Sequence, residues 1–508
     1  MKARSRTYNV VSNSLFGIGA AAIGVALNFL VRIFIVRGLG EEVNGLHNLF
    51  QSTINVLALM ETGISTAMII HLYGPVKNED KTLITQLVGY YKKIYFGIAL
   101  AFLLLGILVD VLVLEHIVTT SIPMWEVKVY FLLFILASSC NYLTFYKKSV
   151  LFAEQKNRVS ILANVCSQLL FRGLSIVFIL LYHQYYIVLV LLILEYLCSN
   201  SICIRYVNKH HPYLKHCRAK LSNEKKKSIF NTIKPLFVNQ IASTVQNSSN
   251  SILISMLLGN VAIVGYYGSY QLVVATITIL FSQMGGAFTS SFGNLAAGKN
   301  KDSMYLAYRK AAFVMYFVAF VCSSIYLGCI QDFIEIIFGK NFVLASSTVL
   351  IIVGSMVIYL LNIPIMSVQN AMGLHRLDDK WMVVQTVAAI LLGYLLGKLY
   401  GMNGILVGVI LPNILFSLGY KGIVISKYAF SQSQTTYLKY ILLQAIKGCL
   451  ICAAVVFILK WIAFENIWLD LVAKGCMSFV LSLFLAFVLY RKDEDMAYMI
   501  NMIKKRFL

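Results

Sequence analysis

The chain has 508 residues, of which 59% are hydrophobic and 13% charged, and its mean hydropathy is +0.77. A soluble protein of this size would carry about 25% charged residues, so the composition excludes an ordinary soluble enzyme. The apolar segments run for about 20 residues or more without strand-like alternation, which is typical of transmembrane helices. The formal net charge of +22 fits basic loops that face an anionic membrane leaflet, so no nucleic-acid partner is expected.

Fourteen transmembrane helices are predicted along the chain. The basic start followed by a long apolar run is interpreted as the first helix and not as a cleavable signal peptide. An even number of spans puts both termini on one side of the membrane. In chain order the predicted spans cover residues 10–37, 43–73, 83–113, 124–147, 159–182, 184–206, 233–258, 262–291, 305–330, 344–371, 380–399, 402–427, 438–462 and 467–490.

The distribution of Lys and Arg predicts the orientation of these spans. Of the 43 basic residues, 34 fall on the side of the two termini, six fall on the opposite side and three lie within spans. Cytoplasmic loops carry the excess of Lys and Arg in membrane proteins. Both termini are therefore expected in the cytoplasm.

Two halves of the chain resemble each other. "RGLGEEVNGLHNLF" after the first span parallels "MLLGNVAIVGYYGSYQ" after the seventh, and "AEQKNRVS" parallels "MGLHRLDD" at nearly the same offset. The sequence therefore predicts two six-helix bundles related as parallel repeats, with a substrate path at their interface. The expected parts are an N-terminal bundle (1–206), a basic cytoplasmic linker (207–232), a C-terminal bundle (233–430) and two additional helices with a basic tail (431–508).

Several charged residues lie inside the predicted spans. At about 1.5 Å of rise per residue, most of them lie at one level, roughly 15–20 Å from the cytoplasmic face. Unpaired charges at such depth cost a few kcal/mol each, so they are expected either to form structural ion pairs or to line a wet cavity. Glu61 is expected to pair with Arg172, with Lys92 or Lys93 as the next candidates, while Arg32 lies too near the outer end. The candidates are Arg32, Glu61, Lys92, Lys93, Arg172 and Glu195.

Neutral polar residues form a second set of candidates at the starts of two spans. Their helical spacing of three or four residues places them on one face of each helix. Such side chains suit hydrogen bonds to sugar hydroxyls, and they equally suit helix–helix contacts in lipid. They are His47, Asn48, Gln51 and Asn55 in the second span and Gln240, Asn247 and Asn250 in the seventh.

Patterns of soluble catalysis are absent from the sequence. There is no phosphate-binding GxxxxGK[ST] loop, no HExxH zinc motif and no extramembrane segment large enough for a nucleotide-binding domain. Cys449 and Cys452 form a lone CxxC without the second pair that a metal site needs. No catalytic residue, metal or cofactor is expected, and the chain is predicted not to be an enzyme.

The first half resembles the Wzx-type polysaccharide flippases of the multidrug/oligosaccharidyl-lipid/polysaccharide exporter superfamily. The resemblance rests on "LGEEVNGLHNLFQSTINVLALMETGISTAMIIHLYGPVKNEDKTLITQLVGYYKKIY" and on "FAEQKNRVS". It implies a bacterial cytoplasmic-membrane protein that moves an undecaprenyl-diphosphate-linked oligosaccharide to the outer leaflet by alternating access of two bundles. Arg32, Arg172, Lys92 and Lys93 would then contact the diphosphate, and Glu61 or Glu195 would couple an ion or form an ion pair.

Three other functions remain open from the sequence. A lipid II flippase would share the fold and the cationic cavity. A cation-coupled multidrug exporter would need a mostly acidic, aromatic cavity, whereas bases match or outnumber acids within these spans. A polysaccharide polymerase or glycosyltransferase would need a large outer loop or a cytoplasmic domain. The resemblance also implies membrane lipid as a partner, with a polysaccharide polymerase and glycosyltransferases as possible functional partners.

Overall fold

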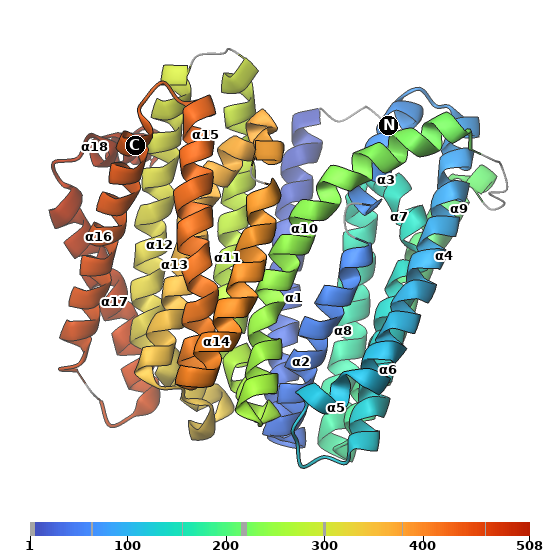
Figure 1. The fold of residues 1–508 in the computed structure, drawn as a ribbon, viewed down its shortest axis with the longest axis horizontal. Coiled ribbons are helices and arrows are strands. Elements are labelled where there is room, and N and C mark those ends of the chain that lie inside the picture. Colours follow the sequence, from blue (N-terminus) through green and yellow to red (C-terminus); the bar gives the residue numbers. More distant parts are fainter. Residues whose placement is uncertain are drawn as a thin grey trace. The chain divides into compact units, whose positions relative to one another are not determined.

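The computed structural model describes residues 6–61, 64–154, 156–214, 221–297, 301–377, 379–462 and 464–507, and within them it contains helices and no strands (Figure 1). In a membrane every backbone polar group needs an internal partner, which an apolar helix provides. Among the described residues, ten helices are long and apolar enough to cross a membrane, or eleven if the bent pair α6–α7 counts as one span. The chain is therefore an all-helical, multi-pass membrane protein, as predicted.

Contacts between Cα atoms divide the chain into two compact units, Met1–Gly265 and Tyr266–Leu508. The predicted linker at 207–232 lies inside the first unit, and the expected domain boundaries stay a prediction. The helices of the first unit are α1 (Arg6–Leu39), α2 (Glu41–Leu57), η1 (Ala58–Met60), α3 (Ile64–Lys77), α4 (Lys81–Leu112), α5 (Leu114–Ile117), α6 (Met124–Tyr142), α7 (Phe145–Ala153), α8 (Asn157–Tyr182), α9 (Tyr185–His210), η2 (Pro212–Leu214) and α10 (Asn223–Leu258).

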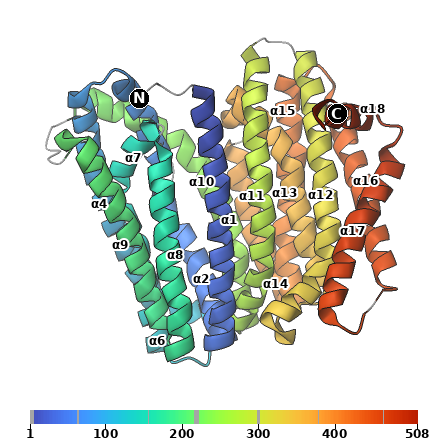
Figure 2. The same cartoon turned by 180° about the vertical axis from the view of Figure 1, so that it is seen from behind.

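In the first unit, α8 packs against both α1 and α9, and α9 also packs against α6 (Figure 2). Helix α10 packs against α2 and α3. A buried apolar cluster under α3, α4 and α7 includes Met68, Tyr91 and Tyr95. This arrangement gives α1, α2, α8 and α9 neighbouring positions in one bundle.

The predicted span 43–73 is not one continuous helix. Helix α2 ends at Leu57, a short 3-10 turn follows, and Glu61 lies in a turn before α3 begins at Ile64. Depth estimates that assume a straight helix therefore do not apply beyond Leu57. This break corrects the prediction of one continuous helix and changes the surroundings of Glu61.

The second unit begins within α11 (Val261–Ala297), and its helices are α12 (Lys301–Phe338), η3 (Lys340–Phe342), α13 (Ser346–Met372), η4 (Leu374–Leu377), α14 (Asp379–Pro412), the π-helix η5 (Asn413–Tyr420), α15 (Lys421–Ala429), α16 (Gln434–Leu459), α17 (Ile467–Tyr490) and α18 (Glu494–Phe507). Helix α12 packs against α13, α16 and α17.

Helix α14 folds back on itself at Gly401, which has φ 59° and ψ −139°. A Cβ on Gly408 would lie 2.5 Å from Gly393 N. In a straight helix these two residues would be about 22 Å apart, so the segments before and after Gly401 are antiparallel neighbours. The turn falls between the predicted spans 380–399 and 402–427.

The C-terminal helix α18 is tied to the second unit by one apolar face and a group of ion pairs. Met496 and Met499 are buried against a cluster from α12, α16 and α17. Arg309 of α12 contacts Asp495 at 2.8 Å and Glu494 at 3.2 Å. Lys447 of α16 contacts Asp493, next to α18, at 2.7 Å. Helix α18 therefore contacts α12 together with the two additional helices, α16 and α17.

Asp495→Ala is expected to loosen α18 while Glu494→Ala leaves it docked. The Asp495 side chain is 8% exposed and the Glu494 side chain 88% exposed, and an exposed ion pair contributes little to stability. We expect Asp495→Ala to accelerate amide hydrogen exchange in α18 by about 10- to 100-fold, because a buried charged hydrogen bond is worth about 1.5–3 kcal/mol. Equal exchange in the two variants would contradict this role for Asp495.

Candidate functional site

A polar cluster lies in the first unit, where α1, α2, α8 and α9 approach one another. We call it the arginine cluster; it consists of Asn28, Arg32, His47, Asn48, Arg172, Tyr185 and Glu195. Asn28 and Arg32 are four residues apart and therefore share one face of α1. Because α1 packs on α8, this face meets Arg172.

Arg172 makes a double contact with the carboxylate of Glu195: its Nε and Nη2 donate to the two oxygens, each at 3.2 Å. Nη1 donates to Asn28 Oδ1 at 2.5 Å and to the Gly24 carbonyl at 3.5 Å. The side chains of Arg172 and Glu195 are 15% and 5% exposed. This bidentate geometry is the strong form of an Arg–carboxylate pair, and it joins α1, α8 and α9.

Arg32 is buried without an acidic partner. Its residue is 8% exposed, and Nη1 donates to Asn48 Oδ1 on α2. Asn48 is held in turn by a bond from its Nδ2 to the Asn44 carbonyl at 3.0 Å. No carboxylate of the described residues lies within salt-bridge distance of Arg32. A buried charge normally has a counter-ion, so the Arg32 guanidinium is suited to receive an anionic group.

His47 connects the two arginines into one site. Its Nδ1 and the Tyr185 hydroxyl are hydrogen-bonded at 2.9 Å, and its ring packs edge-on against Phe134. The ring is close enough to Arg32 and Arg172 to interact electrostatically with both. His47 therefore lies between the part of the cluster around Arg32 and the part around Arg172.

The other two predicted polar residues of α2 lie outside the arginine cluster. Gln51 and Asn55 are exposed, and Gln51 Nε2 donates to Asn55 Oδ1 at 3.1 Å. On α10, the side chains of Gln240 and Asn247 lie outside the described part of the structure. Asn250 is half-buried on α10, which packs against α2.

Lys92 and Lys93 are exposed on α4. No hydrogen bond or ion pair joins either of them to a residue that the structure describes. The structure therefore brings together Arg32, Arg172 and Glu195 of the charged candidates, without a direct contact from the two lysines.

Glu61 does not pair with Arg172, which corrects the prediction from depth. Its Oε1 accepts a hydrogen bond from the Tyr95 hydroxyl at 2.9 Å, and Ser65 also donates to it. The break after η1 turns this carboxyl toward α4, whereas Arg172 is already held by Glu195. Glu61 therefore occupies a hydroxyl-lined position distinct from the arginine cluster.

Asn28 and Tyr185 are site residues that the sequence reasoning missed. Asn28 precedes Arg32 by one helical turn, so the i, i+4 spacing was a usable signal. Tyr185 begins α9 directly after the short α8–α9 connection, and nothing in its local sequence marks it as a partner of His47.

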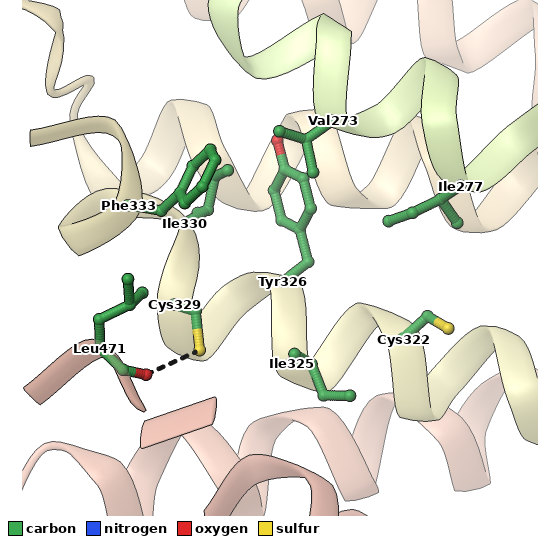
Figure 3. A pocket seen from close by; sticks show the side chains of 9 residues that line it. All are labelled: Val273, Ile277, Cys322, Ile325, Tyr326, Cys329, Ile330, Phe333 and Leu471. Carbon is green, nitrogen blue, oxygen red and sulfur yellow. Dashed lines mark hydrogen bonds between the residues drawn. The ribbon is translucent and has the colours of Figure 1, made fainter. Parts of the chain in front are cut away.

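The second unit contains an apolar pocket of about 260 Å³ between α11, α12 and α17 (Figure 3). The Cys329 thiol points to the Leu471 carbonyl, with 3.8 Å between sulfur and oxygen. Nearby, Lys474 of α17 contacts Asp332 of α12 at 2.9 Å and Asp470 at 2.5 Å. The pocket is lined by Val273, Ile277, Cys322, Ile325, Tyr326, Cys329, Ile330, Phe333 and Leu471.

No protein-family model and no curated protein matches the sequence. Among solved structures, the lipid II flippase MurJ in an inward closed conformation is similar with a TM-score of 0.69 and 14% identity, over 94% of this chain and 99% of that chain. An inward-facing multidrug resistance MATE family transporter of the MOP superfamily is similar with a TM-score of 0.67 and 15% identity, over 79% of this chain and 94% of that chain.

The MATE transporter VcmN of Vibrio cholerae, solved as a point mutant, gives a TM-score of 0.58 and 14% identity, over 84% of this chain and 96% of that chain. These three structures are of transporters and a flippase, not of enzymes. At such low identity the likeness concerns the fold. The chain therefore has the fold of the MOP-superfamily transporters.

Proposed function

We propose that the protein is a flippase that carries an undecaprenyl-diphosphate-linked oligosaccharide from the cytoplasmic to the outer leaflet of the bacterial cytoplasmic membrane, for surface polysaccharide synthesis. The observation that carries the proposal is Arg32, a buried cation with no acidic partner among the described residues. Arginine is the side chain best suited to bind phosphate oxygens. A diphosphate would supply the missing negative charge.

A further feature fits a lipid-linked sugar. The exposed amides of Gln51 and Asn55 offer donors and acceptors for sugar hydroxyls beside the arginine cluster. The proposed substrate has an anion and a sugar that match these groups, and its prenyl tail would stay in the lipid.

The proposed topology has fourteen spans, with both termini in the cytoplasm and two six-helix bundles that work by alternating access. The backfolded helix α14 supports two spans in Lys380–Ala429, and α2–α3 and α10 would supply two more. The strong excess of Lys and Arg on one side supports the orientation. The proposed domains remain 1–206, 207–232, 233–430 and 431–508.

A lipid II flippase for peptidoglycan is the second candidate function. The likeness to MurJ extends over 94% of this chain, against 79% for the inward-facing MATE transporter. This wider coverage favours a carrier of lipid-linked sugars over a multidrug exporter. Lipid II and a polysaccharide repeat unit share the prenyl diphosphate, so the arginine cluster suits both.

Arg32→Gln is expected to weaken binding of farnesyl diphosphate, a short prenyl diphosphate probe, by about 10- to 100-fold, because a hydrogen bond to a charged group is worth about 1.5–3 kcal/mol. Calorimetric titration of the protein in lipid nanodiscs measures this affinity. Thermal stability should be unchanged or higher, because the variant removes a buried charge that lacks a counter-ion. Arg37→Gln, on an exposed position of the same helix, is the matched control. Equal affinities of Arg32→Gln and wild type would remove Arg32 from the site.

Complementation separates the two candidate substrates. In a strain that lacks its polysaccharide flippase, we expect the protein to restore surface polysaccharide and to prevent accumulation of lipid-linked repeat units. In a strain depleted of its lipid II flippase, we expect no rescue of growth. Rescue of growth without restored polysaccharide would replace the first proposal by the second.

A further inference from the structure

Two neighbouring lysines of α4 lie outside the arginine cluster. Lys92 and Lys93 are exposed, and neither forms a hydrogen bond or an ion pair with a residue that the structure describes. Two adjacent like charges repel each other, so their position is favourable where an anion lies close by. The surroundings of the pair on α4 indicate which kind of anion this is.

Beyond the lysines, α4 presents a continuous apolar face toward its C-terminus. Residues three or four apart share one face of a helix, and five side chains at this spacing are each at least half exposed. An exposed apolar face of this size marks a contact with lipid or with a partner, whereas a sugar-binding face would carry polar groups. The five side chains are those of Phe96, Leu100, Leu104, Leu108 and Val111.

The length of α4 places the two lysines at the edge of the hydrocarbon core. Its 32 residues rise by about 48 Å, which exceeds the core thickness of about 30 Å. Residues 94–112 rise by about 27 Å and contain one charged residue, Asp110, so they match the core. Lys92 and Lys93 directly precede this run. In the proposed orientation they therefore lie at the level of the head groups of the cytoplasmic leaflet.

A third lysine approaches the pair from α10. Tyr90 precedes Lys93 by three residues and is therefore its neighbour on the surface of α4. Lys226 Nζ lies 6.0 Å from the centre of the Tyr90 ring and donates to Asn223 Oδ1 at 3.1 Å. No carboxylate of the described residues pairs with Lys226. Two helices of the first unit thus bring uncompensated cations to one place.

We propose that Lys92, Lys93 and Lys226 bind the phosphate of an anionic phospholipid of the cytoplasmic leaflet, with an acyl chain along Phe96 and Leu100. The cytoplasmic leaflet is rich in anionic lipid, and lysine binds phosphate as a point charge. The chain contacts the exposed apolar face, where burial of apolar surface stabilises it. This site is separate from the arginine cluster and does not depend on the identity of the transported substrate.

A tryptophan reporter on α4 tests the site. In Phe96→Trp, quenching of the added fluorescence by lipids with brominated chains measures which lipid lies at the site, and the protein without the reporter gives the background of the four native tryptophans. We expect phosphatidylglycerol to bind at least about 25-fold more tightly than phosphatidylcholine, because each lysine near a membrane surface contributes about a factor of five. With Lys92→Gln/Lys93→Gln the two lipids should bind equally to within about fivefold. High salt should also reduce the preference.

The matched control is Lys427→Gln/Lys439→Gln, which removes the same charge from exposed positions of the second unit and should leave the preference at the reporter unchanged. Equal preferences in Lys92→Gln/Lys93→Gln and its parent would overturn the proposal. If the reporter variant does not fold, native mass spectrometry decides the matter: Lys92→Gln/Lys93→Gln should retain about one phosphatidylglycerol fewer than wild type, and equal retention would overturn the proposal.

Farnesyl diphosphate distinguishes the phospholipid from the transported substrate. We expect Lys92→Gln/Lys93→Gln to bind this probe with the affinity of wild type, because the arginine cluster is intact. A loss of affinity as large as that expected for Arg32→Gln, together with displacement of phosphatidylglycerol from the reporter by the probe, would assign the lysines to the substrate and overturn the phospholipid site. Failure of wild type to bind the probe would instead count against the proposed function and leave the phospholipid site intact.

Discussion

Arg172→Ala is expected to lower the free energy of unfolding by about 3–5 kcal/mol, the typical cost of removing one partner of a buried ion pair. The loss does not measure the attraction between the two groups. It arises because Glu195, with its side chain 5% exposed, is left buried without the two donors that compensate its carboxylate. The contacts of Arg172 with Asn28 and Gly24 on α1 are lost in the same variant.

The matched comparison is Lys128→Ala, which breaks the ion pair with Glu115. Those side chains are 29% and 54% exposed, and an exposed pair contributes little to stability. Thermal unfolding in detergent or nanodiscs measures both variants. Arg172→Ala/Glu195→Gln should recover part of the lost stability, because the amide removes the unpaired charge. Similar losses in Arg172→Ala and Lys128→Ala would mean that the Arg172–Glu195 pair is solvated.

The pairing of Arg172 with Glu195 could have been predicted from the sequence. Arg172 lies ten residues before the end of α8 at Tyr182, and Glu195 lies ten residues after the start of α9 at Tyr185. A two-residue connection makes the two helices antiparallel neighbours, so these positions lie at equal height. Height in the membrane alone would place Glu61 at the level of Arg172 as well. The short connection between α8 and α9 is what favours Glu195 over Glu61 as the partner of Arg172.

The position of Glu61 could not be predicted from periodicity. The estimate of depth assumed a constant rise per residue, which the 3-10 turn at Ala58–Met60 interrupts. The carboxyl then meets Tyr95 of α4, a contact that depends on the packing of two helices. Composition predicted the helices themselves well, because the membrane requires every span to satisfy its own backbone hydrogen bonds.

Arg32 shows a different limit of sequence reasoning. Its depth below the outer end and its separation from Glu61 were predicted, and the structure gives it a neutral partner, Asn48, from the predicted polar stripe. The absence of a carboxylate near Arg32 among the described residues depends on the rotation of α1 and α2 about their axes. In the sequence, only the polar face of each helix indicates how the helix is rotated. A polar face is expected both at a sugar site and at a contact between helices, so it does not identify the partner of Arg32.

The second large effect is expected at the fold-back of α14, where two helices meet through glycines. A Cβ on Gly408 would lie 2.5 Å from the Gly393 nitrogen and 2.5 Å from the Leu392 carbonyl oxygen. Both neighbours are backbone atoms, which cannot rotate away as a side chain can. Small residues let membrane helices approach this closely, so any side chain at position 408 must separate the two segments.

Gly408→Ala is therefore expected to destabilise the second unit by about 1–3 kcal/mol, the usual cost of overpacking. The matched control is Gly354→Ala on α13, where nothing lies within 4 Å of the added Cβ. There the substitution should be neutral or stabilising by up to about 1 kcal/mol, because Ala is the better helix former. Thermal unfolding compares the two directly.

The separation of the two segments should also be visible at their other contacts. Gln385 Nε2 donates to Asn413 Oδ1 at 2.6 Å, and the Ser417 hydroxyl donates to Gln385 Oε1 at 3.1 Å, across the same pair of helices. The π-helix η5 begins at Asn413, so this network fixes the start of the irregular segment. We expect Gly408→Ala to increase amide hydrogen exchange in η5, and Gly354→Ala to leave it unchanged. Unchanged exchange and stability in Gly408→Ala would show that the helices of α14 can separate without cost, and that the close approach does not hold the fold-back together.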